Sequence, residues 1–185
     1  FAAVGADYLQ RTRTHRGVAP HFIDKLPFNY LYCGPIRLAL PQAKIIQLTR
    51  HPLAACYAVF KTLFKDAYPF SYDFAELAKY YAGYRRLMRH WHEAMPGTIL
   101  DVAYEDLVGD LEGQTRRVLE FCGLEFESAC LAFHRNANPS YTASAAQVRR
   151  PLYDSSVALW RNYEPQLAPL RQALLEAGIP AAELR

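Results

Sequence analysis

The chain has 185 residues, a length that suits one domain, and 51% of them are hydrophobic, which is enough for a core and excludes a disordered chain. Its 21 basic and 18 acidic residues leave a formal charge of +3. This excess is too small for a nucleic-acid binder, so any anion site must be local. No segment is long and apolar enough to cross a bilayer, so no membrane partner is expected.

The first half of the chain predicts a helix, a loop, a strand and a second helix. Residues 1–10 read as the end of an amphipathic helix, and because the chain starts with Phe1 and not with Met, further sequence is expected upstream. A loop rich in proline and aromatic residues follows over 20–32. Lys44–Leu48 predicts a short buried strand. Pro52 is well placed to begin a helix, since its missing N–H costs nothing at that position.

The second half continues the alternation of helices and strands. The predicted elements are a long helix over 73–95 between Asp73 and Pro96-Gly97, a buried strand over 98–103, a helix over 111–122 closed by Gly123, a short helix over 127–133, a loop over 136–146 and a last helix over 165–177 with Gly178 at its C-terminus. Strands that alternate with helices predict an α/β domain with a parallel sheet.

Four cysteines lie within apolar runs and form no CxxC pair; they are Cys33, Cys56, Cys122 and Cys130. Buried free thiols are the simplest interpretation of this pattern. Free thiols are typical of a reducing compartment, so the cytoplasm is the expected location.

Three segments carry candidate binding groups. Arg50 follows the first strand and precedes a helix N-terminus, where free N–H groups and a guanidinium could bind phosphate, although an arginine at a strand end can also be a surface ion pair. Lys25 stands between apolar residues near a proline, either as a positive charge in a cleft or as a lysine that reaches past apolar neighbours to solvent. The stretch 140–151 combines hydroxyls with Arg149 and Arg150, and could capture phosphate or be a solvated basic loop.

Taken together and in order, these segments resemble the sulfotransferases that use 3′-phosphoadenosine-5′-phosphosulfate (PAPS). The resemblance is to the tyrosylprotein-sulfotransferase-like branch, including bacterial members fused to tetratricopeptide repeats, and it covers the chain from about Asp7 onward. The matching segments are Ile23–Leu31 with its Asp-Lys-x-Pro, Pro41–Ile46 followed by Arg50-His51-Pro52, Val102–Leu107 with its Tyr-Glu-x-Leu, and Ser144–Pro151 with Trp160 beyond.

The resemblance implies a role for each matching residue. Arg50 would bind the 3′-phosphate of the nucleotide, and Tyr104 would contact the nucleotide nearby. Lys25 matches the catalytic lysine that stabilises charge on the leaving phosphate. Ser144 would bind the phosphates and help to place the sulfuryl group. Arg149 or, by preference, Arg150 would close over the phosphates. Lysine and arginine supply the positive charge in such a site, so no metal is expected.

Two departures from the family pattern stand out. The Gly-rich 5′-phosphosulfate loop, which should follow the first strand, is not found before Lys25, and the usual general base should be missing with it. The 3′-phosphate motif normally carries a serine at the place occupied here by Ala58, and loss of this hydroxyl could weaken nucleotide binding by on the order of 1 kcal/mol. Lys61, one turn further on, is a candidate to compensate.

The fold implied by the resemblance is a three-layer α/β domain like that of P-loop nucleotide kinases, with its first strand absent. Residues 1–185 would then form a single domain, the C-terminal part of a sulfotransferase domain. Loss of the first strand should expose a hydrophobic edge and destabilise the domain.

The leading hypothesis is therefore transfer of a sulfuryl group from PAPS to a hydroxyl acceptor, with peptide tyrosine, sugar, lipid and small phenols all open. The parent protein could also carry tetratricopeptide repeats upstream. A second hypothesis is a module that binds PAPS or its product, 3′,5′-adenosine bisphosphate, without catalysis. A metal-dependent hydrolase is disfavoured because His90 and His92 are two residues apart and diverge on a helix. A kinase is disfavoured because the chain has no Walker A sequence.

Overall fold

The computed structural model describes residues 1–64, 67–135 and 149–185. The chain forms two compact units. Unit 1 comprises Phe1–Ile45 and Tyr84–Ile99, and unit 2 comprises Ile46–Gly83 and Leu100–Arg185.

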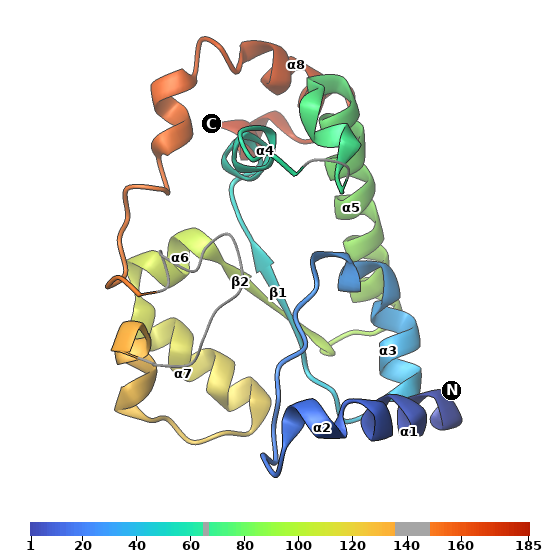
Figure 1. Ribbon diagram of the computed structural model, residues 1–185. Coiled ribbons are helices and arrows are strands. Elements are labelled where there is room, and N and C mark those ends of the chain that lie inside the picture. Colours follow the sequence, from blue (N-terminus) through green and yellow to red (C-terminus); the bar gives the residue numbers. More distant parts are fainter. Residues whose placement is uncertain (65–66, 136–148) are drawn as a thin grey trace. The chain divides into compact units, whose positions relative to one another are not determined.

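Ten α-helices and strands follow one another in the described part of the chain (Figure 1). They are α1 (Ala2–Arg11), α2 (Arg13–Arg16), α3 (Cys33–Ala39), β1 (Ile45–Thr49), α4 (Pro52–Phe60), α5 (Phe74–Ala94), β2 (Ile99–Ala103), α6 (Tyr104–Gly109), α7 (Leu111–Cys122) and α8 (Ala168–Glu176). Short 3₁₀ helices lie at Pro27–Tyr32, Pro69–Tyr72, Ser128–Arg135, Leu159–Tyr163 and Ala181–Leu184.

The two strands pair as a small parallel sheet, in agreement with the α/β class predicted from the sequence. Both strands lie where the apolar runs predicted them, within one residue at each end. The expectation that β1 is a fully buried run is wrong. Successive side chains of a strand point to opposite faces, and on one face of β1 Ile46 and Leu48 are 42% and 60% exposed.

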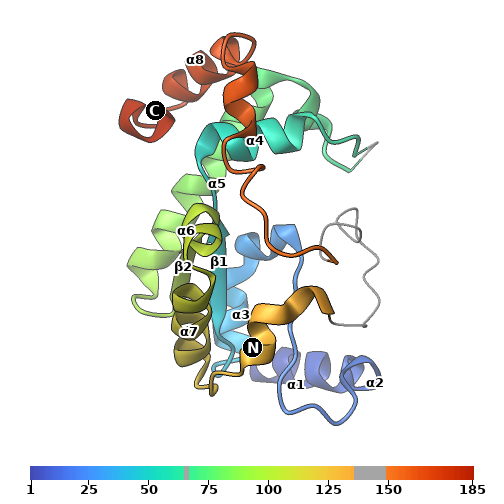
Figure 2. The ribbon, with the colours of Figure 1, turned by 90° about the vertical axis from the view of Figure 1, so that its left-hand side faces the viewer.

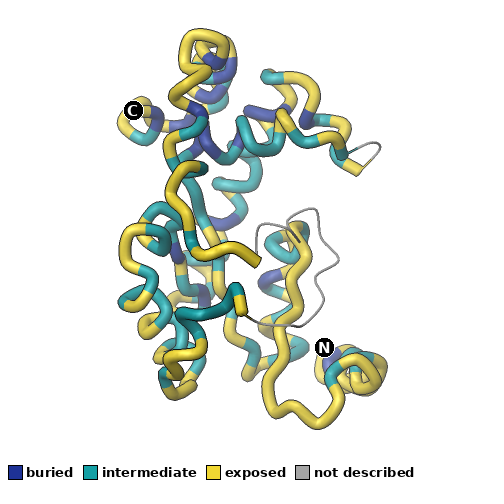
Figure 3. Tube along the Cα trace, turned by 60° about the vertical axis from the view of Figure 1, so that its left-hand side comes forward, coloured by how far each residue is buried: buried dark blue, intermediate teal, exposed yellow. Residues whose placement is uncertain are grey.

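Unit 2 has its core where α4, the first half of α5 and α8 meet. Helix α4 brings Leu53 and Cys56, and α8 brings Leu170 and Leu174, all of them at most 1% exposed. Trp160, from a 3₁₀ turn, completes the cluster at 2% exposed. Figure 2 shows α8 and the C-terminal segment beside α4, and Figure 3 shows buried positions gathered there. Unit 2 therefore has a continuous apolar core.

Unit 1 has a smaller cluster of buried residues, in which Cys33 and Met88 are each 3% exposed. The indole of Trp91 packs against this cluster and donates its Nε1–H to the carbonyl of Tyr30 over 2.8 Å. Helix α1 approaches α3 closely at Gly5, because a Cβ there would lie 1.9 Å from the carbonyl oxygen of Ala39. A glycine is thus required at this contact.

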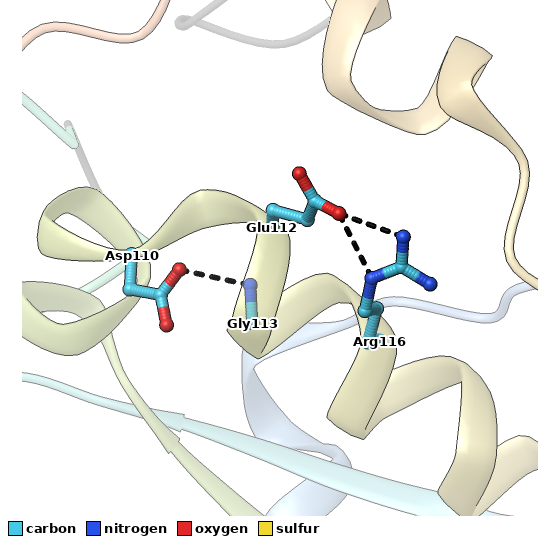
Figure 4. Close-up of polar contacts among 4 residues, drawn as sticks. All are labelled: Asp110, Glu112, Gly113 and Arg116. Carbon is cyan, nitrogen blue, oxygen red and sulfur yellow. Dashed lines mark hydrogen bonds and ion pairs between the residues drawn. The ribbon is translucent and has the colours of Figure 1, made fainter.

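Side-chain caps and a glycine define several helix ends, and those at Asp73 and Gly123 were predicted. The Asp73 carboxylate accepts from the backbone N–H of Glu76 over 2.9 Å at the start of α5. At α7, Asp110 Oδ1 accepts from Gly113 N–H over 2.9 Å, and Arg116 pairs with Glu112 one turn along (Figure 4). Helix α7 ends, as predicted, at Gly123, whose φ of 70° favours glycine.

Other parts differ from the predictions. The segment predicted as a loop over 20–32 ends in a 3₁₀ helix, Pro27–Tyr32, and the short helix predicted over 127–133 is a 3₁₀ helix, Ser128–Arg135. The last helix begins at Ala168 and not at Pro165. The reason is Pro169, which has no N–H and is therefore tolerated only in the first turn. The sequence patterns did not indicate α2, α3 or α6, and the loop predicted over 136–146 lies outside the described residues.

All four cysteines are free thiols; Cys33 and Cys56 are buried, whereas Cys122 and Cys130 are half-buried. Burial raises the pKa of the Cys56 thiol to about 12. Among the described helices, none combines the length and the apolar character that a membrane crossing needs.

Candidate functional site

Arg50 is the residue that follows β1, and its guanidinium is held by two other segments of unit 2. The group lies over the ring of Tyr104, with Cζ 4.9 Å from the ring centroid. Nη2 donates to the backbone carbonyl of Ser156. Nε is buried, and among the described residues it has no hydrogen-bond partner. The cation is therefore positioned by protein groups on two sides, and its buried Nε–H is a donor that no described residue uses.

Tyr104 and Ser156 also contact each other. Tyr104 is the first residue of α6, directly after β2, and its hydroxyl lies 2.6 Å from the Ser156 hydroxyl, where either oxygen could donate. The ends of both strands thus meet the 154–160 segment at one place. The sequence predicted that Arg50 and Tyr104 share a site, and the structure brings them together.

The N-terminus of α4 is occupied by an internal anion. His51 is the residue before Pro52, the first residue of the helix, and its backbone N–H donates to Glu105 Oε1 over 2.9 Å. The carboxylate also offsets the positive end of the helix dipole. The N–H of His51 is therefore already used by the protein, and the expectation that the helix N–H groups of α4 meet a phosphate stays a prediction.

The His51 ring is fixed between two C-terminal groups of unit 2. It stacks on the Trp160 indole with the ring centroids 4.7 Å apart and lies with Nε2 3.1 Å from the backbone oxygen of Arg185. Since a carbonyl only accepts, Nε2 carries the proton, and Nδ1 is buried without a partner among the described residues. Burial lowers the pKa of His51 below its ordinary value of 6.5.

A small pocket of about 40 Å³ opens beside Arg50. Its lining includes Arg50, Ala58, Lys61, Ser156 and Trp160, and none of the described residues that line it is acidic. The pocket is far smaller than the several hundred cubic ångströms of a typical site for an entire small molecule. It therefore suits a compact anionic group. Ala58 lies in this lining, at the place where the family pattern expects a serine.

Lys25 belongs to unit 1, where it is exposed. The preceding Asp24 is held by two side chains: the Tyr8 hydroxyl donates to Oδ2 over 2.6 Å, and Asn29 Nδ2 donates to Oδ1 over 3.4 Å. Burial and the bond to Asp24 raise the pKa of Tyr8 to about 12. The segment that carries Lys25 is thus hydrogen-bonded to α1 and to the next element of the chain, the 3₁₀ helix Pro27–Tyr32.

The remaining predicted residues lie in or beside the stretch that is not described. Arg149 and Arg150 are both exposed. Ser144 lies outside the described residues. No group of three or more candidate metal ligands occurs in the described parts of the chain.

The comparisons with known proteins decide the family. A profile described as "Sulfotransferase family" matches residues 1–128, which include Lys25, Arg50 and Tyr104. The chain belongs to the sulfotransferase family. It is similar to an uncharacterized protein of Aquifex aeolicus, with 36% identity over 172 residues that cover 91% of this chain and 23% of that protein.

A second relative carries a functional name. A putative protein-tyrosine sulfotransferase of Caenorhabditis briggsae is 23% identical over 164 residues, which cover 85% of this chain and 58% of that protein. The chain thus spans only part of the length of both curated relatives. The family match ends at residue 128, so it does not support a role for Arg149, Arg150 or Ser156.

Three further residues contribute contacts to this candidate site, although none of them had a predicted role of its own: Glu105, Ser156 and Trp160. A signal for Glu105 existed, since it stands within the Tyr-Glu-x-Leu that marks the family. Trp160 belongs to the C-terminal segment that resembles the family, and Ser156 is one of the hydroxyl residues that follow Arg150, but no local pattern predicted the specific contact that either one makes. Only the chain's return to the end of β1 shows that they belong to the site.

Proposed function

We propose that the protein to which this chain belongs transfers a sulfuryl group from PAPS to a hydroxyl acceptor, and that the pocket beside Arg50 binds the 3′-phosphate of the nucleotide. The observation that carries the proposal is the guanidinium of Arg50 placed over Tyr104 at the rim of a pocket without acidic lining. Arginine is matched to phosphate in charge and donor geometry. Family membership supports PAPS as the donor.

The other roles follow the family pattern and are part of the proposal. Lys25 stabilises the negative charge on the 5′-phosphate, which is the leaving group when the sulfuryl group moves to the acceptor oxygen. Ser144 helps to place the sulfuryl group. Arg149 and Arg150, with Arg150 preferred, close over the phosphates. Such a set works by position and charge, as phosphoryl-transfer sites do.

The acceptor, the architecture and the setting are also proposals. A protein tyrosine is the acceptor that the name of the Caenorhabditis briggsae relative supports. The two strands would belong to the central sheet of a three-layer α/β sulfotransferase domain that contains residues 1–185. The protein could carry tetratricopeptide repeats outside this chain, and the free thiols support a reducing compartment such as the cytoplasm.

The test is a calorimetric titration of the chain with 3′,5′-adenosine bisphosphate. We expect binding that falls by at least about tenfold in Arg50→Ala, because removal of a charge-assisted contact costs about 1.5–3 kcal/mol. Arg50→Lys should recover only part of the loss, because a point charge replaces the planar fork of donors. Arg116→Ala, which removes an arginine paired with Glu112 on α7, is the matched control.

A folded wild-type chain that fails to bind, or an Arg50→Ala variant that binds as well as the wild type, contradicts the proposal. Circular dichroism of each variant separates loss of binding from loss of the fold. Transfer itself is tested with the full-length parent protein, radiolabelled PAPS and tyrosine peptides.

A second candidate function is a module that binds the nucleotide without catalysis. Ala58 in the pocket favours it, because the hydroxyl expected there is absent and nucleotide binding should be weaker. Bisphosphate binding by a full-length parent that labels no hydroxyl acceptor would support this alternative and contradict the transferase.

A further inference from the structure

The pocket beside Arg50 has Ala58 at the place where the family pattern has a serine, so the hydroxyl of that serine is missing. A phosphate monoester carries nearly two negative charges at neutral pH, as phosphorylated side chains do. Arg50 provides one positive charge, and its Nη2 already donates to Ser156. The His51 N–H donates to Glu105. The groups considered so far therefore leave the anion short of both charge and donors.

Lys61 lies on the lining of the same pocket, directly after the last residue of α4. It follows Ala58 by three residues, so both positions lie on one side of the helix. Its Nζ stands 5.1 Å from the ring centroid of Tyr57, another lining residue. The aromatic face holds the ammonium near the pocket while the residue as a whole stays exposed. Lys61 can thus bring the second positive charge.

Ser156 supplies a hydroxyl to the pocket from a different segment. Its hydroxyl lies 2.6 Å from that of Tyr104. If Tyr104 donates to Ser156, the Ser156 proton is free to point to an anion in the pocket, and the two hydroxyls then act as a short relay. The nearby Thr62 cannot serve in this way without losing a bond, because its hydroxyl donates to the carbonyl of Ala58 over 2.7 Å.

We infer that Lys61 and Ser156 take the place of the missing serine, so that this chain binds the 3′-phosphate with Arg50, Lys61 and the Tyr104–Ser156 hydroxyl pair. The inference rests on the proposed function. It states that the loss at position 58 is offset by groups already present and that the pocket keeps its preference for a 3′-phosphorylated nucleotide.

The experiment measures the affinity ratio between 3′,5′-adenosine bisphosphate and 5′-AMP, which differ only in the 3′-phosphate. We expect Lys61→Ala to lower the affinity for the bisphosphate by about tenfold, and Ser156→Ala by about three- to tenfold. Both should leave the affinity for 5′-AMP unchanged. Lys61→Arg should restore most of the loss, and Ala58→Ser in the Lys61→Ala background should restore part of it.

Two controls separate binding from structural roles. Lys79→Ala removes an exposed lysine that pairs with Glu76 on α5, and should leave both affinities unchanged. Tyr104→Phe keeps the Ser156 hydroxyl but removes the donor behind it, so it should cost less than Ser156→Ala. An equal cost in the two variants would mean that Ser156 serves only to hold Tyr104, and would overturn its assignment.

The outcomes also separate this inference from the proposed function. A wild-type chain that prefers the bisphosphate, loses that preference in Arg50→Ala and keeps it in Lys61→Ala and Ser156→Ala upholds the function and overturns the inference. A folded wild-type chain that binds the two nucleotides equally overturns the 3′-phosphate site itself and the inference with it.

Discussion

The two units hold their candidate residues in different ways. In the described part of unit 2, eleven buried residues form the core around α4 and α8, and Trp160 links this core to His51, the neighbour of Arg50. In unit 1 the buried cluster has three residues, and Lys25 is flanked by Leu26 and, two residues before it, Ile23, which are 54% and 93% exposed. A packed core therefore positions Arg50, whereas local polar contacts position the Lys25 segment.

The largest expected effect tests the unequal cores directly. Leu170→Ala removes a side chain that is 0% exposed in the core of unit 2 and should lower the free energy of unfolding by about 3–5 kcal/mol, because a cavity remains. Met88→Ala, in the smaller cluster of unit 1, should cost less, about 2–3 kcal/mol, because fewer buried neighbours surround it. Urea denaturation measures both, and a larger cost for Met88→Ala would reverse the comparison.

A matched pair of hydroxyl deletions sharpens the contrast between the two sites. Tyr104→Phe and Tyr8→Phe each remove one hydrogen bond of 2.6 Å, the first in a part-buried contact and the second in an exposed one. We expect losses of about 1 kcal/mol and about 0.5 kcal/mol, since water replaces the exposed partner more readily. The same denaturation experiment checks both, and equal losses would show that burial does not separate the two contacts.

Acid should weaken the link between the unit 2 core and Arg50. Burial lowers the pKa of His51. The backbone oxygen of Arg185 and the charge of Glu105 oppose this shift, whereas the charges of Arg161 and Arg171 add to it. As the pH falls, His51 therefore takes up a proton in the unfolded chain near pH 6.5 and in the folded chain only at a lower pH. The contribution of neutral His51 to the free energy of unfolding is complete above pH 6.5 and is lost as the pH falls through the folded pKa. His51→Gln should flatten this part of the profile.

Melting temperatures of the wild type and His51→Gln at about pH 7.5 and about pH 5.5 provide the measurement. The wild type should lose more stability between the two values than the variant does. Identical losses in the two proteins would show that a group other than His51 causes the loss of stability in acid.

The smallest effect concerns the exposed face of β1. Leu48→Thr replaces leucine with a β-branched residue that suits a strand, at a position that is 60% exposed, and should change the free energy of unfolding by less than about 0.5 kcal/mol. A loss of several kcal/mol in the isolated chain would mean that this face is covered, and would contradict its exposure.

Much of the fold could be predicted because local signals mark it. Asp73 caps α5, Gly123 closes α7, and the apolar runs place both strands. The short helices α2, α3 and α6 had no such signals, since none is long enough to show a periodic pattern. The three-layer sheet and the role of Ser144 stay predictions, because the former needs further strands and the latter lies outside the described residues.

The site was predicted only as far as sequence motifs reach. Arg50 and Tyr104, to which the resemblance gave neighbouring roles, lie in contact, and Ala58 lines the pocket beside Arg50. The sequence could not show that Glu105 takes the N–H of His51 or that Ser156 returns to the end of β1. Such contacts depend on the tertiary path of the chain, which no local pattern encodes.

The contacts at Arg50 also have a consequence for how the protein is made. Arg50 and Ser156 are 106 positions apart, and Tyr104 and Ser156 are 52 apart. Contacts between distant positions carry a loop-closure cost and form slowly. A chain emerging from the ribosome cannot assemble this half-site until residue 156 has been translated and released from the exit tunnel. Nucleotide capture during refolding would therefore report the completion of unit 2 and not an early stage of its folding.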